Sequence, residues 1–128
     1  MKEEIKKKLT EYIKSEKGLF FTDVEWFFKE QGYDFKGEKC IFLINDNGTP
    51  NYSQVVWADW SEEAVDMICE IINESNGKIG LRVSTDPIMI MLGGGGLNLP
   101  ISHNFEYTYK KPHWAPGTIE YLGGKQKC

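Results

Sequence analysis

The chain has 128 residues, of which 41% are hydrophobic and 27% are charged, and its formal net charge is -4. This composition excludes an intrinsically disordered protein, and the length fits a single domain. No apolar run reaches the roughly 18 residues of a membrane helix, and the N-terminus lacks the apolar region of a signal peptide. The three cysteines are too few for a disulfide scaffold. We therefore expect a cytoplasmic protein without membrane association.

The first predicted element is an amphipathic helix over residues 3–16. Its apolar side chains recur at the spacing of one helical face, and these are Ile5, Leu9, Tyr12 and Ile13. The lysines that lie off this face are expected to point into solvent, and these are Lys6, Lys7, Lys8 and Lys14. The segment therefore predicts a helix with one buried face and one basic, solvated face.

A second helix is predicted over residues 22–31. Thr22 and Glu25 have the spacing of a capping box, in which each side chain accepts a hydrogen bond from a backbone N–H group of the other residue. Phe21 and Trp26 have the spacing of a hydrophobic staple across the same helix start. The aromatic content of this segment indicates a core helix in preference to an aromatic binding groove.

Two β-hairpins are predicted, one on each side of a third helix. Residues 40–57 hold two β-forming runs, and Asn47-Gly48 between them suits a turn with positive φ. In the second hairpin, residues 79–83 alternate between apolar and other side chains, Thr85-Asp86-Pro87 forms the turn, and residues 88–92 return as a strand. The four glycines that follow are expected to form a flexible turn, because no phosphate-loop lysine or helix start comes after them.

The third helix is predicted over residues 61–75, with Asp59 or Ser61 as its N-terminal cap. Its buried face is expected to consist of Ala64, Val65, Ile68, Ile71 and Ile72. Four acids of this helix fall at perfect i+4 spacing, and these are Glu62, Asp66, Glu70 and Glu74. No base on the helix offsets them, and like charges at this spacing repel. The stripe is interpreted either as a solvated acidic face or as a surface for a basic partner.

Residues 102–128 are predicted to form a tail that packs on the same domain. Phe105, Tyr107 and Tyr109 alternate as on a strand face, and a short basic and aromatic segment follows, with Lys110, Lys111, His113 and Trp114. Such a segment can stack nucleic-acid bases and bind phosphate, or it can hold an irregular tail across the core. We favour the tail, and we expect the last six residues to be frayed.

The order of these elements resembles a winged-helix domain over residues 1–101. The resemblance implies an α+β fold with a three-helix core formed by 3–16, 22–31 and 61–75, a C-terminal wing hairpin over 78–92, and an inserted hairpin over 40–57. The segment GLNLPI and the later KKPHW are also similar to small uncharacterised proteins from bacteria and their phages.

The charge distribution argues against the usual function of that fold. Residues 40–77 hold seven acids and no lysine or arginine, and the third helix, which would enter the major groove, carries five of these acids. We therefore expect a non-enzymatic protein-interaction or adaptor module, a class that includes phage and mobile-element inhibitors. Its acidic helix would meet another, basic protein. The alternative is a nucleic-acid-binding transcriptional regulator that uses the wing and the basic ends, with Lys78, Arg82, Lys110 and Lys111.

No catalytic or cofactor motif is present in the sequence. The two histidines, His103 and His113, are not arranged with cysteines at a metal-ligand spacing, and no nucleophile elbow occurs. Cys40 lies in an apolar strand and Cys69 beside the buried face of the third helix, which favours a structural role for both thiols. We therefore expect no catalytic residue, no metal and no cofactor.

Overall fold

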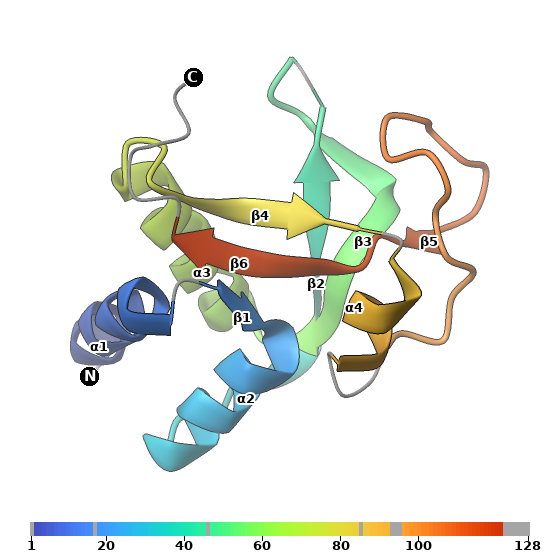
Figure 1. Ribbon diagram of the computed structural model, residues 1–128. Helices are drawn as coiled ribbons and strands as arrows, with labels where there is room; N and C mark the ends of the chain where they lie inside the picture. Colours follow the sequence, from blue (N-terminus) through green and yellow to red (C-terminus); the bar gives the residue numbers. More distant parts are fainter. Residues whose placement is uncertain (1, 17, 46, 85, 93–95, 122–128) are drawn as a thin grey trace.

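The computed structural model describes residues 2–16, 18–45, 47–84, 86–92 and 96–121, and it has an α+β fold (Figure 1). The elements are α1 (Lys2–Glu16), β1 (Gly18–Phe20), α2 (Phe21–Glu30), β2 (Lys36–Ile44), β3 (Pro50–Trp60), α3 (Glu62–Glu74), β4 (Ile79–Val83), α4 (Pro87–Leu92), β5 (His113–Trp114) and β6 (Gly117–Tyr121). Among the described residues, no helix has both the length and the apolar character needed to cross a membrane.

The strands form two three-stranded sheets. The first sheet has the order β1-β6-β4 and is antiparallel throughout, with β6 (red in Figure 1) between β1 and β4. The second sheet has the order β2-β3-β5, in which β2 pairs antiparallel with β3 and β5 pairs parallel with β3. Residues 117–121, which the sequence placed in a tail, thus supply the central strand of the first sheet.

The core lies between one face of the first sheet, the helices α1, α2 and α3, and the second sheet. Leu19, Ile119 and Leu81 lie in one row across β1, β6 and β4, and the first two are buried. Leu9 and Ile13 of α1 are fully buried in the same cluster, which confirms the predicted apolar face of this helix. On the apolar face predicted for α3, Ala64, Ile68 and Ile71 are buried, whereas Val65 and Ile72 are only partly buried. Met67, which was not predicted, is buried as well.

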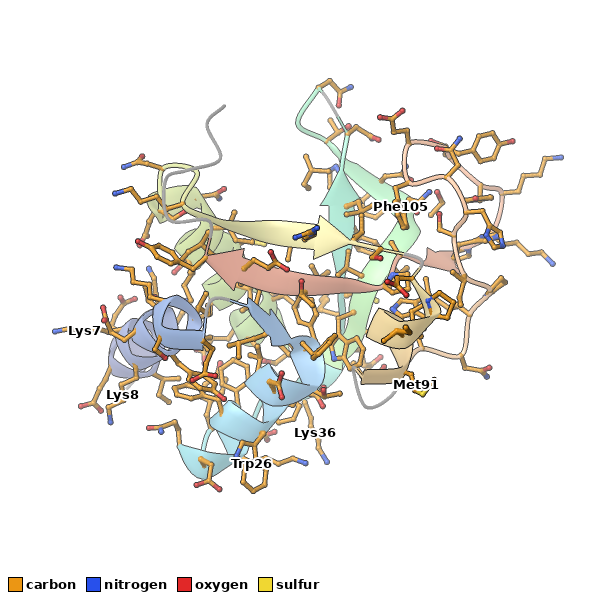
Figure 2. The ribbon with its side chains drawn as sticks, in the orientation of Figure 1. Lys7, Lys8, Trp26, Lys36, Met91 and Phe105 are labelled. Carbon is orange, nitrogen blue, oxygen red and sulfur yellow. The ribbon has the colours of Figure 1, made fainter. Side chains whose placement is uncertain are left out.

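Helix α2 begins one residue before the predicted position, and the predicted N-cap is wrong by two residues. Phe20, not Thr22, occupies the N-cap position, and the Asp23 carboxylate accepts a hydrogen bond from the Phe20 backbone N–H at 3.0 Å. The predicted staple is absent as well, because Trp26 is 61% exposed (Figure 2) while Phe21 is buried. The helix therefore begins directly after β1, and Glu25 is released for another role.

The first hairpin and the start of α3 are confirmed. Strands β2 and β3 pair on either side of a turn in which Gly48 has a φ of 86°, a value that favours glycine. The Ser61 hydroxyl caps α3 by accepting a hydrogen bond from the Ala64 backbone N–H at 3.1 Å. Asp59, the other cap candidate, precedes this position and has a φ of 66°.

The second hairpin is wrong, because residues 88–92 are part of helix α4. The Asp86 carboxylate accepts a hydrogen bond from the Ile88 backbone N–H at 2.9 Å, and Pro87 occupies the first helical position, where its missing N–H group costs nothing. Strand β4 instead pairs with β6 over Ile79–Val83. The two-stranded wing expected over residues 78–92 is therefore not formed.

The segment before β5 is irregular. Residues 105–109, predicted as a strand from their alternating aromatic side chains, form a turn and an extended stretch without a ladder. The backbone carbonyls of Asn104 and Tyr107 accept hydrogen bonds from the buried Gln54 amide at 2.9 and 2.8 Å. The glycines at 93–95 and the end of the chain, 122–128, lie outside the described residues.

Candidate functional site

The acidic stripe of α3 is divided by its contacts with α1. Lys6 of α1 lies with its amino group 3.2 Å from one Glu70 carboxylate oxygen and 3.0 Å from a Glu74 carboxylate oxygen, and Lys2 reaches Glu70 at 3.6 Å. The Lys6 side chain is only 12% exposed, so its predicted place on a solvated face is wrong. Lys7 and Lys8, by contrast, point away from the protein (Figure 2).

The two halves of the stripe, Glu62 with Asp66 and Glu70 with Glu74, therefore differ in their electrostatic surroundings. The hydrogen bond from Lys6 lowers the pKa of Glu70, and the hydrogen bond to Glu74 raises the pKa of Lys6. Glu62 and Asp66 are exposed and form no hydrogen bond or ion pair with the described part of the chain. A cation on another helix offsets the second half of the stripe, which the sequence of α3 alone could not reveal.

The four bases predicted for nucleic-acid binding border three different hollows. Lys78 borders one with Lys14 and Glu74, while Arg82 borders a second and pairs with Glu120. The two remaining bases, Lys110 and Lys111, share the third hollow with Tyr52 and Tyr109. The structure brings these last two together and keeps the others apart, so no single basic surface results.

A cavity of about 370 Å³ lies where the first sheet, the second sheet and α4 meet. Its apolar wall consists of aromatic and aliphatic side chains from both sheets and two helices, and these include Phe20, Phe21, Trp57, Ile90, Trp114 and Pro116. The polar groups that line it come mainly from the first sheet, through Arg82, Thr118 and Glu120. The cavity thus combines an aromatic wall with a few polar side chains, as ligand sites do.

The register of the first sheet places its polar groups on the face opposite the core. Phe20, Thr118 and Arg82 are direct partners across β1, β6 and β4, so their side chains share one face. Glu120 lies two residues farther along β6 and so projects from the same face. Its partners on the two neighbouring strands are both glycines, Gly18 and Gly80, and the Glu120 side chain lies over Gly18 with 20% of its surface exposed.

Trp114 is the most unusual group in the cavity wall. It is 7% exposed, and its indole Nε1 is buried without a hydrogen-bond partner among the described residues. Gly96 packs on the six-membered part of the ring so closely that a Cβ atom there would lie 2.4 Å from Cη2. The indole is therefore held by packing and by β5, while its N–H group has no acceptor in the described part of the chain.

The opposite situation holds for Trp57 in the same wall. Its Nε1 donates a hydrogen bond to the Glu25 carboxylate at 2.9 Å, and the buried Trp60 donates to the same oxygen at 2.9 Å. The Phe21 ring stacks on Trp57 with centroids 5.9 Å apart. Glu25, predicted as part of a capping box, thus fixes two indoles and, through Trp57, one wall of the cavity.

The groups that could support catalysis are not assembled in the described part of the chain. Burial raises the pKa of the Cys40 thiol and of the Cys69 thiol, which disfavours the reactive thiolate. The His113 ring stacks on Tyr109 with centroids 3.7 Å apart, and its Nδ1 lies 2.9 Å from the Lys111 carbonyl oxygen. Over residues 2–121, apart from the undescribed gaps, no group of three His, Cys, Asp or Glu side chains could hold a metal ion.

Sequence reasoning missed most of this cavity. Trp57, Glu120 and Phe20 were not singled out, and Trp114 was assigned to a basic and aromatic segment without a defined partner. A usable signal was the β-forming run of residues 117–121 after Pro116, which predicts a strand that exposes Thr118 and Glu120 on one face. Comparison with known proteins found no matching family model, no similar curated protein and no similar solved structure.

Proposed function

We propose that this protein is a non-enzymatic binding module that takes up a small organic ligand in the cavity between its two sheets. The observation that carries the proposal is the composition of this cavity, in which aromatic side chains such as Trp57 and Trp114 lie beside a few polar groups, among them Arg82 and Glu120. Clefts lined by apolar and aromatic side chains with a few polar groups are typical of small-molecule sites.

The size and composition of the cavity support the same proposal. Its volume of about 370 Å³ falls within the roughly 300–1,000 Å³ of typical ligand pockets. The three charged side chains that line it already have partners: Arg82 pairs with Glu120 at 3.6 Å, and Asp86 accepts the Ile88 N–H. These groups are better suited to orienting a ligand than to activating a nucleophile.

The experiment that tests this proposal uses two variants of α4. Ile90 lines the cavity, whereas Ile88 is 64% exposed on the same short helix and does not line it. A panel of small aromatic and aliphatic fragments is screened against the unmodified protein by thermal shift and tryptophan fluorescence. We expect Ile90→Trp to abolish the binding of any hit and Ile88→Trp to preserve it. Equal binding by both variants, or no hit at all, would refute the cavity as the binding site.

A second candidate function is the recognition of a basic protein by α3. The observation that favours it is that Glu62 and Asp66 are exposed and unpaired with the described residues, although Glu70 and Glu74 are bound by Lys6. We expect the double variant Glu62→Gln, Asp66→Gln to lose most of the salt-sensitive binding to a lysine-rich peptide. Exposed Glu3 and Glu4 of α1 provide the matched control, and equal losses in both double variants would exclude a specific acidic surface.

The proposal also covers the setting and the ancestry of the protein. A cytoplasmic location is supported by the sparse cysteines. A relationship to winged-helix domains is supported only by the order of α1, α2 and α3 along the chain, since the wing hairpin is not formed. Fractionation of cells that express the tagged protein tests the location.

A further inference from the structure

Resting on the proposed function, we infer that the ligand of the cavity is an organic cation, a protonated amine on an apolar body. The ammonium group lies against the Glu120 carboxylate, and the apolar body lies against the aromatic wall. Three features of the cavity point to this class of ligand: the sign of the charges that line it, the unequal exposure of those charges to water, and a carboxylate behind its wall.

The charged side chains that line the cavity are mainly negative. Two carboxylates, those of Glu120 and Asp86, line it together with one guanidinium, that of Arg82, and its described lining includes no lysine or histidine. An ionised carboxylate only accepts hydrogen bonds, so these two groups complement a positively charged donor. An anionic ligand would instead meet two like charges and one opposite charge.

The base that lines the cavity is much more exposed to water than the acid with which it pairs. The Arg82 side chain is 75% exposed, whereas the Glu120 side chain is largely covered and lies over Gly18. Solvent screens an exposed charge more strongly than a partly buried one, so the field of Glu120 dominates inside the cavity.

The Glu120 carboxylate is also available to an incoming cation. Its ion pair with Arg82 is loose, with 3.6 Å between Nη1 and Oε1, so an ammonium group can replace the guanidinium at this oxygen. The other carboxylate oxygen accepts a hydrogen bond from the Thr118 hydroxyl at 2.9 Å, which orients the group. Charge-assisted hydrogen bonds between an ammonium group and a carboxylate are stronger than neutral ones.

The aromatic wall favours a cation as well. Trp57 and Phe20 supply its partly exposed rings, because Phe21 and Trp114 are buried. The Trp57 indole donates its N–H to the Glu25 carboxylate at 2.9 Å, so a third negative charge lies behind the wall. Aromatic rings attract ammonium groups through the negative potential of their faces, and the apolar body of the ligand gains by leaving water.

The test uses three six-carbon probes that differ in the charge of the head group: hexylamine, a cation at pH 7, 1-hexanol, which is neutral, and hexanoate, an anion. Their affinities for the unmodified protein are measured at low ionic strength by tryptophan fluorescence and thermal shift. We expect hexylamine to bind about tenfold more tightly than 1-hexanol, because only the amine forms a charge-assisted hydrogen bond with Glu120. Hexanoate is expected to bind most weakly.

Three variants assign this preference to the side chains. Glu120→Gln keeps an acceptor for the Thr118 hydroxyl but removes the charge, and it is expected to lose most of the advantage of hexylamine over 1-hexanol. Arg82→Gln removes the competing cation and is expected to tighten hexylamine binding about threefold, a gain that damage to the fold would not produce. The matched control is Lys78→Gln, which removes the same charge from an exposed side chain beside another hollow and is expected to leave the affinity unchanged.

The possible results separate the inference from the proposed function. Equal affinities of the three probes, tighter binding of hexanoate, or equal gains in Arg82→Gln and Lys78→Gln would overturn the inference. The proposed function would stand in those cases if the fragment panel still gave a hit that Ile90→Trp abolishes. Failure of the three probes and of every fragment in the panel would overturn both.

Discussion

The pairing of Glu25 with two indoles leads to a specific prediction about stability. Glu25→Ala removes the carboxylate oxygen that accepts hydrogen bonds from Trp57 Nε1 and Trp60 Nε1, both at 2.9 Å. Trp60 is 1% exposed, so its N–H group would be left buried without an acceptor, while the half-buried Trp57 can reach water. We expect the free energy of unfolding to fall by about 2–4 kcal/mol, since each hydrogen bond to a charged group contributes ~1.5–3 kcal/mol and water compensates part of the loss.

This loss can be expressed as a melting temperature. With an unfolding entropy of about 2.1 cal/mol/K per residue, 128 residues give about 0.27 kcal/mol/K, so Tm should fall by about 7–15 °C. Thermal melts followed by circular dichroism measure the change, and near-ultraviolet signals report the two indoles directly. Glu25→Gln, which keeps an acceptor oxygen, should fall by clearly less.

The matched control is Glu30→Ala, an exposed acid at the end of the same helix. Surface substitutions usually change stability by no more than about 0.5 kcal/mol, so this control should stay within about 2 °C of the unmodified protein. If Glu25→Ala melts together with Glu30→Ala, the carboxylate does not hold the two indoles, and the assignment of Glu25 to the wall of the cavity is wrong.

Three further outcomes are expected. Glu70→Lys should lower Tm, because it places a cation against Lys6 and Lys2. Asp66→Lys should leave Tm unchanged or raise it. A higher Tm in both variants would show that the contact between α1 and α3 is not formed. Lys6 lowers the pKa of Glu70 in the folded protein from its ordinary value of 4.5. The stability from this pair is therefore present above pH 4.5 and is lost as the pH falls through the lowered pKa of Glu70. The Tm difference between the unmodified protein and Glu70→Gln, measured from pH 7 to pH 2, should shrink toward the acid end. Ser61→Ala should cost about 1 kcal/mol in urea unfolding, and Ser61→Asp should cost much less, because aspartate also caps a helix.

The elements that the sequence predicted well depend on local patterns. The apolar faces of α1 and α3, the Ser61 cap and the β2–β3 hairpin around Gly48 each follow from residues that are close together in the chain. Helix α4 was predicted as a strand because a short apolar run has no diagnostic period. The local signal that could have corrected it was Asp86-Pro87, which is typical of a helix start.

The remaining features depend on contacts between distant parts of the chain. Lys6 meets Glu70 and Glu74 only because α1 packs beside α3, and no pattern within either helix encodes that neighbour. Trp114 becomes a cavity wall only after β5 pairs with β3. The candidate site was therefore less predictable than the fold, since its polar and aromatic groups come from β4, β5, β6 and the helix α2 that follows β1.

The central place of β6 in the first sheet sets the timing of assembly during translation. Strands β1 and β4 have no partner in that sheet until residues 117–121 leave the ribosome, because each of them pairs only with β6. Until then both strands present open edges, and the nascent chain is exposed to aggregation and to chaperones. The long separation between β1 and β6 also slows closure of the sheet after synthesis. A chain that ends before residue 117 lacks the strand that joins β1 to β4, and we therefore expect that it cannot form the first sheet.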